Sequence, residues 1–215
     1  DVGLGVLERL KLKSTFYVLP NSVARRQAAW QEAVKQGHEI GHHSYTHACT
    51  ANYRRSNALE DWTLERMGED LDRATAEIGK LLNVKPESFA YPCGQKFVGR
   101  GAATRSYVPL IAERFLCGRG YLDEAANDPE VCDLAALMGI HFDETPFTGM
   151  RKVLERAARD GRWVIFAGHE IGKLAYQTTD VGALEELAAY VHDTAQGIWL
   201  APVGEIARYV KSQRD

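Results

Sequence analysis

The sequence Gly37-His38-Glu39-Ile40-Gly41-His42-His43-Ser44-Tyr45-Thr46-His47 contains four of the seven histidines in the 215-residue chain. Imidazole nitrogens are preferred ligands of Zn²⁺ and of other borderline divalent cations, and histidines a few positions apart can bind one ion. The stretch therefore predicts a metal site. Its ligands can be assigned in two ways, and each assignment implies a different enzyme.

The first assignment takes the segment H-E-I-G-H as the H-E-x-x-H motif of a zinc protease. On a helix, His38 and His42 would share a face and bind the metal, and Glu39 would activate its water. The surrounding sequence argues against a helix, because one glycine precedes the motif and another lies inside it. The longer protease motif requires glycine at position 45 and histidine at position 48, where this chain has Tyr45 and Ala48.

The second assignment treats residues 37–40 as a turn that leads into a short buried strand. His43 and His47 then bind the metal, and the Ser44 hydroxyl caps or braces the turn between them. A reading in which these histidines are ordinary surface or core residues is less favoured, because clustered histidines with ligand spacing are seldom only structural.

Four segments together resemble the polysaccharide deacetylases, the NodB-homology family of metal-dependent carbohydrate esterases. They are STFYV at 14–18, GHEIGHHSYTH at 37–47, FAYPCG at 89–94 and FAGHEIG at 166–172, in the order and rough spacing of that family. The resemblance implies an α/β fold, the irregular (β/α) barrel of the family without its first strand. It implies removal of N- or O-linked acetyl groups from a carbohydrate or polysaccharide, with zinc, or else cobalt, nickel or manganese, as cofactor.

The resemblance also implies the roles of individual residues. His43 and His47 are metal ligands, and His169, at the end of a buried apolar run, is the general acid. The third motif forms one wall of the substrate groove and consists of Tyr91, Pro92, Cys93 and Gly94. The backbone N–H at position 93 is expected to hold the oxyanion that develops on the acetyl oxygen.

The first motif of the family carries two aspartates, the general base and the third metal ligand, and this chain has no Asp-Asp pair. We expect those residues to lie shortly before Asp1, in a segment of the natural protein that this sequence lacks. A carbohydrate-binding relative without hydrolytic activity is therefore an alternative. Many members carry an arginine where this chain has Ala90, and the candidates for the fourth motif are Arg105, Arg119 and Asp133.

Composition is typical of one globular domain over residues 1–215, with 45% apolar and 26% charged residues. The net charge of −3 and the pI near 6.2 give no electrostatic argument for binding nucleic acid or an anionic membrane. No apolar run approaches the roughly 20 residues that span a bilayer. An acetylated carbohydrate is the expected partner, and neither the cellular location nor the oligomeric state is determined.

The four cysteines at 49, 93, 117 and 132 form no C-x-x-C pair. We expect them to be buried or half-buried free thiols, because a free cysteine behaves as a small apolar residue. Free thiols weakly favour a reducing compartment.

Hydrophobic periodicity predicts alternating helices and strands. Helices are expected at the start of the chain through Leu10, at 21–36 with Asn21 or Ser22 as N-cap, over the periodic residues Leu64 to Leu82 with Asp61 as N-cap, at 147–159 and 181–192, and in a last helix through Val210. Strands are expected at 14–19, 88–91, 115–121, 163–167 and 198–200.

Overall fold

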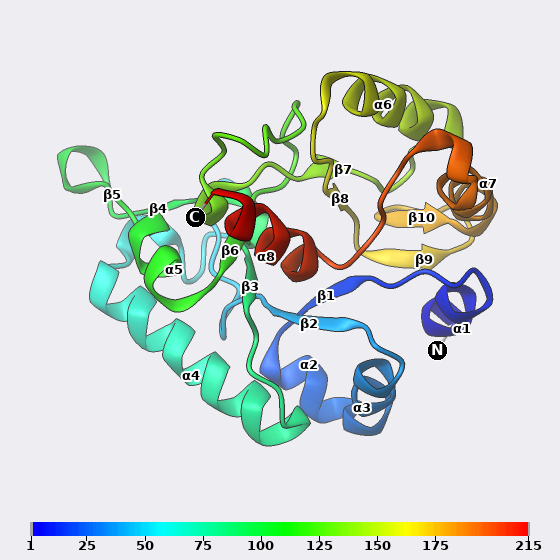
Figure 1. Ribbon diagram of the computed structural model, residues 1–215. Helices are drawn as coiled ribbons and strands as arrows, with labels where there is room; N and C mark the ends of the chain where they lie inside the picture. The colour runs from blue at the N-terminus through cyan, green and yellow to red at the C-terminus, as the bar shows by residue number, and fades with distance from the viewer. Residues whose placement is uncertain (1, 215) are drawn as a thin grey trace. The chain divides into compact units, whose positions relative to one another are not determined.

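Four short parallel strands form the sheet that carries the histidine cluster (Figure 1). They are β1 (Thr15–Val18), β2 (Glu39–His42), β3 (Ser88–Ala90) and β6 (Cys117–Arg119), hydrogen-bonded in the order β1-β2-β3-β6. The structure is a computed structural model that describes residues 2–214. Helices connect the strands, as parallel pairing requires. The predicted α/β class is confirmed.

The described residues divide into two compact units. The histidine unit comprises residues 15–120 and 133–137 and contains the four-stranded sheet. The His169 unit comprises residues 2–14, 121–132 and 138–214.

Three helices of the histidine unit lie along one side of its strands (Figure 1). They are α2 (Pro20–Arg25), α3 (Gln27–Lys35) and α4 (Leu64–Leu82), and α5 (Val108–Arg114) precedes β6. One apolar cluster joins sheet and helices through Val18, Val23, Ile40, Ile78 and Leu82. A second contains Leu59, Leu71, Phe89, Tyr91, Tyr107 and Ile111. The apolar face of α4, which recurs every three or four residues, contributes to both clusters.

The predicted helix over 21–36 is in fact two helices, because the backbone leaves the helical region at Arg26 with φ −140° and ψ 41°. The predicted caps are also wrong. Pro20 occupies the first helical position of α2, where its missing N–H costs nothing. Helix α4 is capped by Thr63, whose hydroxyl accepts from the Arg66 N–H, and Asp61 instead ends the 3₁₀ turn Leu59–Asp61.

Smaller elements complete the histidine unit. They are the antiparallel pair β4 (Phe97–Val98) and β5 (Arg105–Ser106), and 3₁₀ turns at Pro92–Gly94, Gly101–Ala103 and Leu134–Ala136.

The His169 unit contains two parallel pairs of short strands. They are β7 (Ile140–His141) with β8 (Phe166–Ala167), and β9 (Glu170–Gly172) with β10 (Thr178–Asp180). Its helices are α1 (Val2–Arg9), α6 (Phe147–Asp160), α7 (Val181–His192) and α8 (Val203–Arg214), with a 3₁₀ turn at Thr194–Gln196. The predicted helices at 147–159 and 181–192 are confirmed.

Two strand predictions in this unit need correction. Of the run 163–167, only Phe166 and Ala167 form regular strand, and Trp163 makes an isolated bridge to Asn127. Residues 198–200 are not a strand at all. There the Trp199 ring packs edge-on against Tyr209 of α8, with ring centroids 5.2 Å apart, and half of Trp199 is exposed. The apolar Trp199 side chain therefore covers helix α8 and is not part of a sheet.

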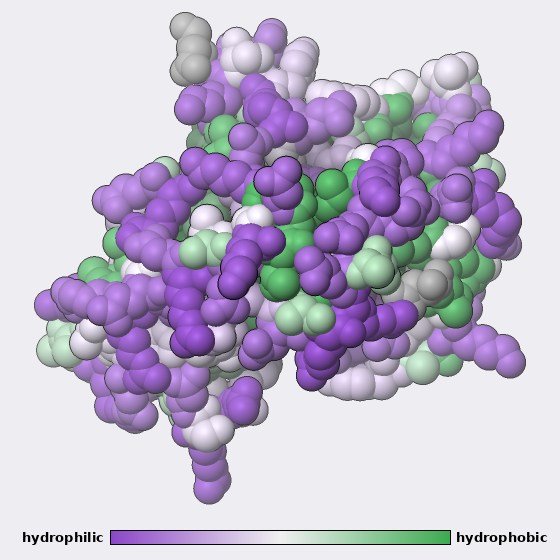
Figure 2. Space-filling view, turned by 90° about the horizontal axis from the view of Figure 1, so that it is seen from below, coloured by the Kyte–Doolittle hydropathy of each residue, from purple (hydrophilic) through white to green (hydrophobic). Residues whose placement is uncertain are grey.

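Hydrophilic side chains predominate on the face drawn in Figure 2, and apolar residues gather there in separate patches. Between residues 2 and 214, no helix is both long enough and apolar enough to cross a bilayer.

Candidate functional site

His42 and His43 are adjacent in sequence but have different surroundings. His42 ends β2 and is completely buried. Its Nε2 lies 3.1 Å from the Leu71 carbonyl oxygen, and its Nδ1 accepts a hydrogen bond from the Ser44 N–H at 3.1 Å. A carbonyl only accepts, so Nε2 carries the proton. Burial lowers the pKa of His42 to about 4, and both of its nitrogens are used inside the fold.

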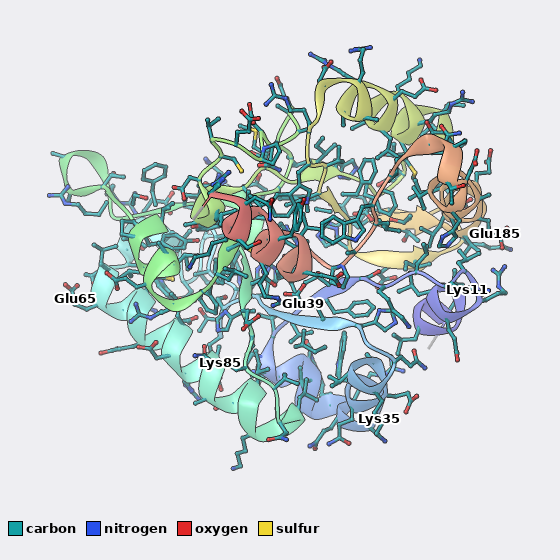
Figure 3. The ribbon with its side chains drawn as sticks, in the orientation of Figure 1. Lys11, Lys35, Glu39, Glu65, Lys85 and Glu185 are labelled. Carbon is teal, nitrogen blue, oxygen red and sulfur yellow. A yellow bond between two sulfur atoms is a disulfide. The ribbon has the colours of Figure 1, made fainter. Side chains whose placement is uncertain are left out.

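The zinc-protease assignment is wrong for this segment, because residues 39–42 form a strand and not a helix. The Glu39 carboxylate accepts hydrogen bonds from the Thr15 and Ser88 hydroxyls, both at 2.6 Å, and thereby joins β1, β2 and β3 (Figure 3). The His38 ring is buried edge-on against Phe16, with centroids 5.2 Å apart. Strand geometry therefore separates the residues that the protease motif would bring together.

His43 is oriented by the neighbouring strand. Its Nδ1 lies 2.8 Å from the carbonyl oxygen of Ala90, the last residue of β3. This bond leaves Nε2 as the nitrogen that can bind a metal, and such a bond from the other ring nitrogen is usual for histidine ligands. Burial, Arg119 and His47 together lower the pKa of His43 to about 3. The imidazole is therefore neutral near pH 7, the form that coordinates a metal.

His47 stands next to His43, with ring centroids 4.7 Å apart and ring planes at 79°. The Ser44 hydroxyl accepts a hydrogen bond from the His47 N–H at 2.9 Å, which confirms the predicted brace. Ser44 and His47 both adopt the left-handed backbone region, with φ of 64° and 52°. This conformation costs free energy for non-glycine residues, and residues that adopt it often lie at functional sites.

Helix α4 supports the loop between the two histidines. Asp70 of α4 is buried, and its carboxylate accepts from the Tyr45 N–H and from the Thr46 hydroxyl, both at 2.7 Å. The Arg73 guanidinium lies over the Tyr45 ring, 3.7 Å from its centroid, and donates to the Tyr45 hydroxyl at 2.6 Å. Two side chains of one helix thus hold the loop in place.

The third motif follows β3. Tyr91 belongs to the core, where its hydroxyl donates to the Ala135 carbonyl at 2.7 Å, and burial raises its pKa. The predicted substrate contact therefore does not apply to the Tyr91 side chain. Pro92 is also buried, whereas Cys93 and Gly94 are half-exposed with φ of 54° and 68°. The motif reaches the surface through the turn at 93–94.

Cys49 and Cys93 form a disulfide, with Cα atoms 5.9 Å apart and a sequence separation of 44. The prediction of free thiols is wrong for this pair, because parallel pairing of β2 with β3 brings the segments after the two strands together. The prediction is confirmed for Cys117, which is buried, and for Cys132, whose sulfur accepts from Arg214 at 3.2 Å.

One group of three potential metal ligands occurs in residues 2–214. It consists of His47, Cys49 and Cys93, whose ligand atoms all lie within 4.8 Å of one another. Within the same span no carboxylate joins His43 and His47 in such a group. The histidine pair fits a divalent metal through two imidazoles, and the described residues provide no acidic third ligand in a group with them.

The His169 unit contains a histidine–carboxylate pair. The Nδ1 of His169 lies 2.6 Å from Asp143 Oδ2, and Asp143 Oδ1 accepts from the His169 N–H at 3.0 Å and from the Thr179 hydroxyl at 3.3 Å. The Asp143 side chain is fully buried, whereas 43% of the His169 side chain is exposed. Because a carboxylate accepts, Nδ1 donates, and Nε2 remains available for proton transfer.

Gly168 permits this pair to form. A Cβ at position 168 would lie 2.6 Å from Asp143 Oδ1, closer than real contacts allow. Tyr121 adds an aromatic wall, with its ring edge-on to His169 at 5.4 Å and its hydroxyl 3.0 Å from His141 Nδ1.

Sequence reasoning missed Asp143 and proposed three other residues for the fourth motif. Arg105 is exposed and bonds nearby carbonyls, and Asp133 caps the 3₁₀ turn Leu134–Ala136. Arg119 pairs with Ala90 across β6 and β3, and its charge acts on His43. A signal for Asp143 was its place two residues after the short strand β7, where parallel strands commonly present site residues.

Comparison with known proteins gives one family match. The polysaccharide deacetylase family model matches residues 2–106, a span that includes the cluster at 37–47 and the motif at 89–94. The uncharacterized protein YlxY of Bacillus subtilis (strain 168) is 33% identical over 91 residues, which are 42% of this chain and 26% of that protein. The chain thus aligns with about a quarter of the curated relative it matches.

Solved structures share the fold. A putative polysaccharide deacetylase from Mycobacterium smegmatis is 19% identical with a TM-score of 0.62, and the match covers 98% of this chain and 76% of that one. The Puue allantoinase is 16% identical with a TM-score of 0.69, covering 97% and 70%. These likenesses confirm the barrel-type α/β fold class.

Proposed function

Because the polysaccharide deacetylase family model matches residues 2–106, we propose that the protein is a metal-dependent hydrolase that removes acetyl groups from a carbohydrate or polysaccharide. One observation carries the proposal. His43 is fixed through its Nδ1 to the Ala90 carbonyl, and the His47 ring lies beside it at 4.7 Å. Two imidazoles in this arrangement suit one divalent cation.

His43 and His47 would hold the metal, with zinc the first candidate and cobalt, nickel or manganese the alternatives. A bound divalent metal supplies Lewis-acid polarisation of the acetyl carbonyl and a water of lowered pKa. The proton of that water would pass to a carboxylate base, which the His43–His47 pair does not have within the described residues. The protein supplies two further groups. In the turn at 92–95, the Gly94 and Gln95 amides donate to the Tyr91 and Pro92 carbonyls, and we assign the Cys93 N–H to the substrate oxygen on which negative charge develops.

His169 acts as general acid in this proposal. Asp143 holds the imidazole through Nδ1, so the proton passes from Nε2 to the departing nitrogen or oxygen of the sugar. The proton matters most for an N-acetyl substrate, because an unprotonated amine leaves poorly. Loss of His169 should therefore slow amide cleavage more than ester cleavage.

The test combines metal content with acetate release. The parent chain and the variants His43→Ala/His47→Ala and His169→Ala are analysed for bound metal and assayed on acetylated chito- and xylo-oligosaccharides. We expect near-stoichiometric metal in the parent and in His169→Ala, acetate release from the parent only, and neither property in the double variant. Glu39→Gln serves as a control. A protease would cleave casein and lose that activity in this variant, whereas a deacetylase would keep most of its acetate release. Absence of metal from the parent would overturn the ligand assignment.

A non-catalytic carbohydrate-binding relative is the second candidate. The observation that favours it is that no carboxylate in residues 2–214 groups with His43 and His47. Such a protein would bind acetylated oligosaccharides in a calorimetric titration and release no acetate even with added Zn²⁺. Acetate release that depends on His43 and His47 would exclude it.

A further inference from the structure

The disulfide between Cys49 and Cys93 occupies a place where three metal-binding side chains converge. The ligand atoms of His47, Cys49 and Cys93 all lie within 4.8 Å of one another. His47 Nδ1 and Cys49 Sγ are already 3.7 Å apart. In a tetrahedral zinc site, a nitrogen at ~2.0 Å and a sulfur at ~2.3 Å from the ion lie about 3.5 Å from each other.

We propose that reduction of the Cys49–Cys93 disulfide converts this cluster into a second metal site, a Cys₂His site for a thiophilic cation such as Zn²⁺, Cd²⁺ or Cu⁺. Thiolates select such soft metals, and two cysteines with one histidine leave the fourth position open. The site does not need the proposed deacetylase activity. It rests on the proposed function only in that it uses His47, which that function assigns to the His43–His47 pair.

The reductant is a thiol or dithiol, and access decides where it reacts. Cys49 is buried, with 3% of its surface exposed, whereas Cys93 is half-exposed in the turn after β3. A thiolate therefore attacks Cys93 Sγ, the S–S bond breaks, and Cys49 leaves as a thiolate. A second thiol resolves the mixed disulfide. The protein gains two electrons and two protons, and the two reductant thiols become one disulfide.

A consequence for regulation follows from the shared ligand. His47 is next to His43 on one side and next to Cys49 on the other. A soft metal held by both thiolates and His47 competes for that imidazole with the metal assigned to the His43–His47 pair. Thiol reduction together with a thiophilic metal therefore withdraws one of the two histidine ligands assigned to the hydrolase.

The probe is Co²⁺, because its coordination by thiolates produces ligand-to-metal charge-transfer absorption that imidazole ligands alone do not give. The full chain is prepared oxidised and reduced, with the Cys49–Cys93 pairing verified by peptide mapping. We expect the absorption only in the reduced protein, and at least tenfold tighter Cd²⁺ binding on reduction. A Cys117→Ala/Cys132→Ala variant, which lacks the two cysteines outside the disulfide, should keep both changes.

Three variants locate the site. Cys49→Ser/Cys93→Ser should abolish the absorption, and His47→Ala should shift the cobalt spectrum and weaken Cd²⁺ binding. His43→Ala should leave the thiolate absorption in place, which separates this site from the His43–His47 pair. Absence of the absorption in reduced wild type, or its persistence in the Cys49→Ser/Cys93→Ser variant, would overturn the proposal. So would unfolding of the reduced chain, monitored by near-ultraviolet circular dichroism. Failure of the acetate assay affects none of these readings.

Discussion

Asp143 is placed to act through His169 and not on a substrate. It is fully buried, and its two oxygens accept three hydrogen bonds, from His169 Nδ1, the His169 N–H and the Thr179 hydroxyl. A buried carboxylate with this pattern fixes both the tautomer and the orientation of the imidazole. Asp143 is thus a positioning residue in the proposed reaction.

The Asp143→Asn variant should lose at least about 100-fold in kcat, because general acid catalysis contributes roughly 10²–10⁴-fold and requires the correct tautomer. KM should change little, and the pH profile of kcat should shift as well. Thr179→Val removes only the 3.3 Å hydrogen bond to the same carboxylate and is the matched control. Equal losses in the two variants would show that Asp143 has only a structural role.

His42 makes stability depend on pH. Its pKa is about 4 in the folded protein, lowered by burial, against about 6.5 in an unfolded chain. The contribution of neutral His42 to the free energy of unfolding is fully present above pH ~6.5 and is lost as pH falls toward ~4, because the unfolded state binds the proton more readily.

The metal-free protein should therefore lose about 2 kcal/mol of unfolding free energy between pH ~6.5 and ~5 through His42 alone. Urea denaturation across this range measures the slope. His42→Gln should reduce this slope by the share of His42, since glutamine does not titrate, and should leave the share of His43, whose pKa is also lowered, to about 3. An unchanged slope would contradict this assignment.

At the scale of elements, helix α4 connects the core to the candidate metal site. Asp70 of α4 holds the loop that carries His47, and it is joined to the loop by two hydrogen bonds of 2.7 Å. Asp72 lies on the same helix but forms an exposed ion pair with Arg114 at 2.8 Å. Asp70 therefore supports the loop, whereas Asp72 contributes only to the charged surface. Comparing variants of the two residues distinguishes these two effects.

Asp70→Asn should weaken metal binding roughly 10–100-fold, because residues that orient metal ligands have effects of this size. Asp72→Asn should leave the affinity almost unchanged. Isothermal titration of both variants with Zn²⁺ checks the difference. Equal Zn²⁺ affinities of the two variants would show that Asp70 of α4 does not support the metal site.

Elements with long apolar periodicity could be predicted from sequence, and those set by tertiary contacts could not. Helices α4, α6 and α7 lie where their periodic residues predicted them. The interruption at Arg26 was missed because the apolar residues on both sides continue one helical pattern. The run at 198–200 was misassigned because an apolar tryptophan covers helix α8 as readily as it enters a sheet.

At the scale of the whole molecule, the chain consists of two units, and the disulfide lies inside the histidine unit. Closing a loop of this length contributes up to about 4 kcal/mol in the chain-entropy account. The pairing could not be predicted from cysteine spacing, because it depends on which strands are neighbours. The roles of His43, His47 and His169 could be proposed from motifs. The signal for Asp143, its place just after β7, was not usable in practice, because this two-residue strand was not predicted from hydrophobic periodicity.

Cys49→Ser/Cys93→Ser should lower the free energy of unfolding of the histidine unit by about 2–4 kcal/mol. Hydrogen exchange should accordingly be faster for amides in residues 15–120 than in the oxidised protein. Amides of α6 and α7, in the His169 unit, are the internal reference and should change less. Equal acceleration in both units would indicate that they unfold as one cooperative body.

The close approach of Gly168 to Asp143 affects how a mutational scan of this protein should be interpreted. Any side chain at position 168 must displace the carboxylate that orients His169, because even a methyl group would meet it at 2.6 Å. A scan that counts lost activity would therefore rank a residue without a functional group among the chemically active ones. Substitutions at position 168 should therefore fail for steric reasons, because the neighbouring Asp143 carboxylate leaves no room for a side chain.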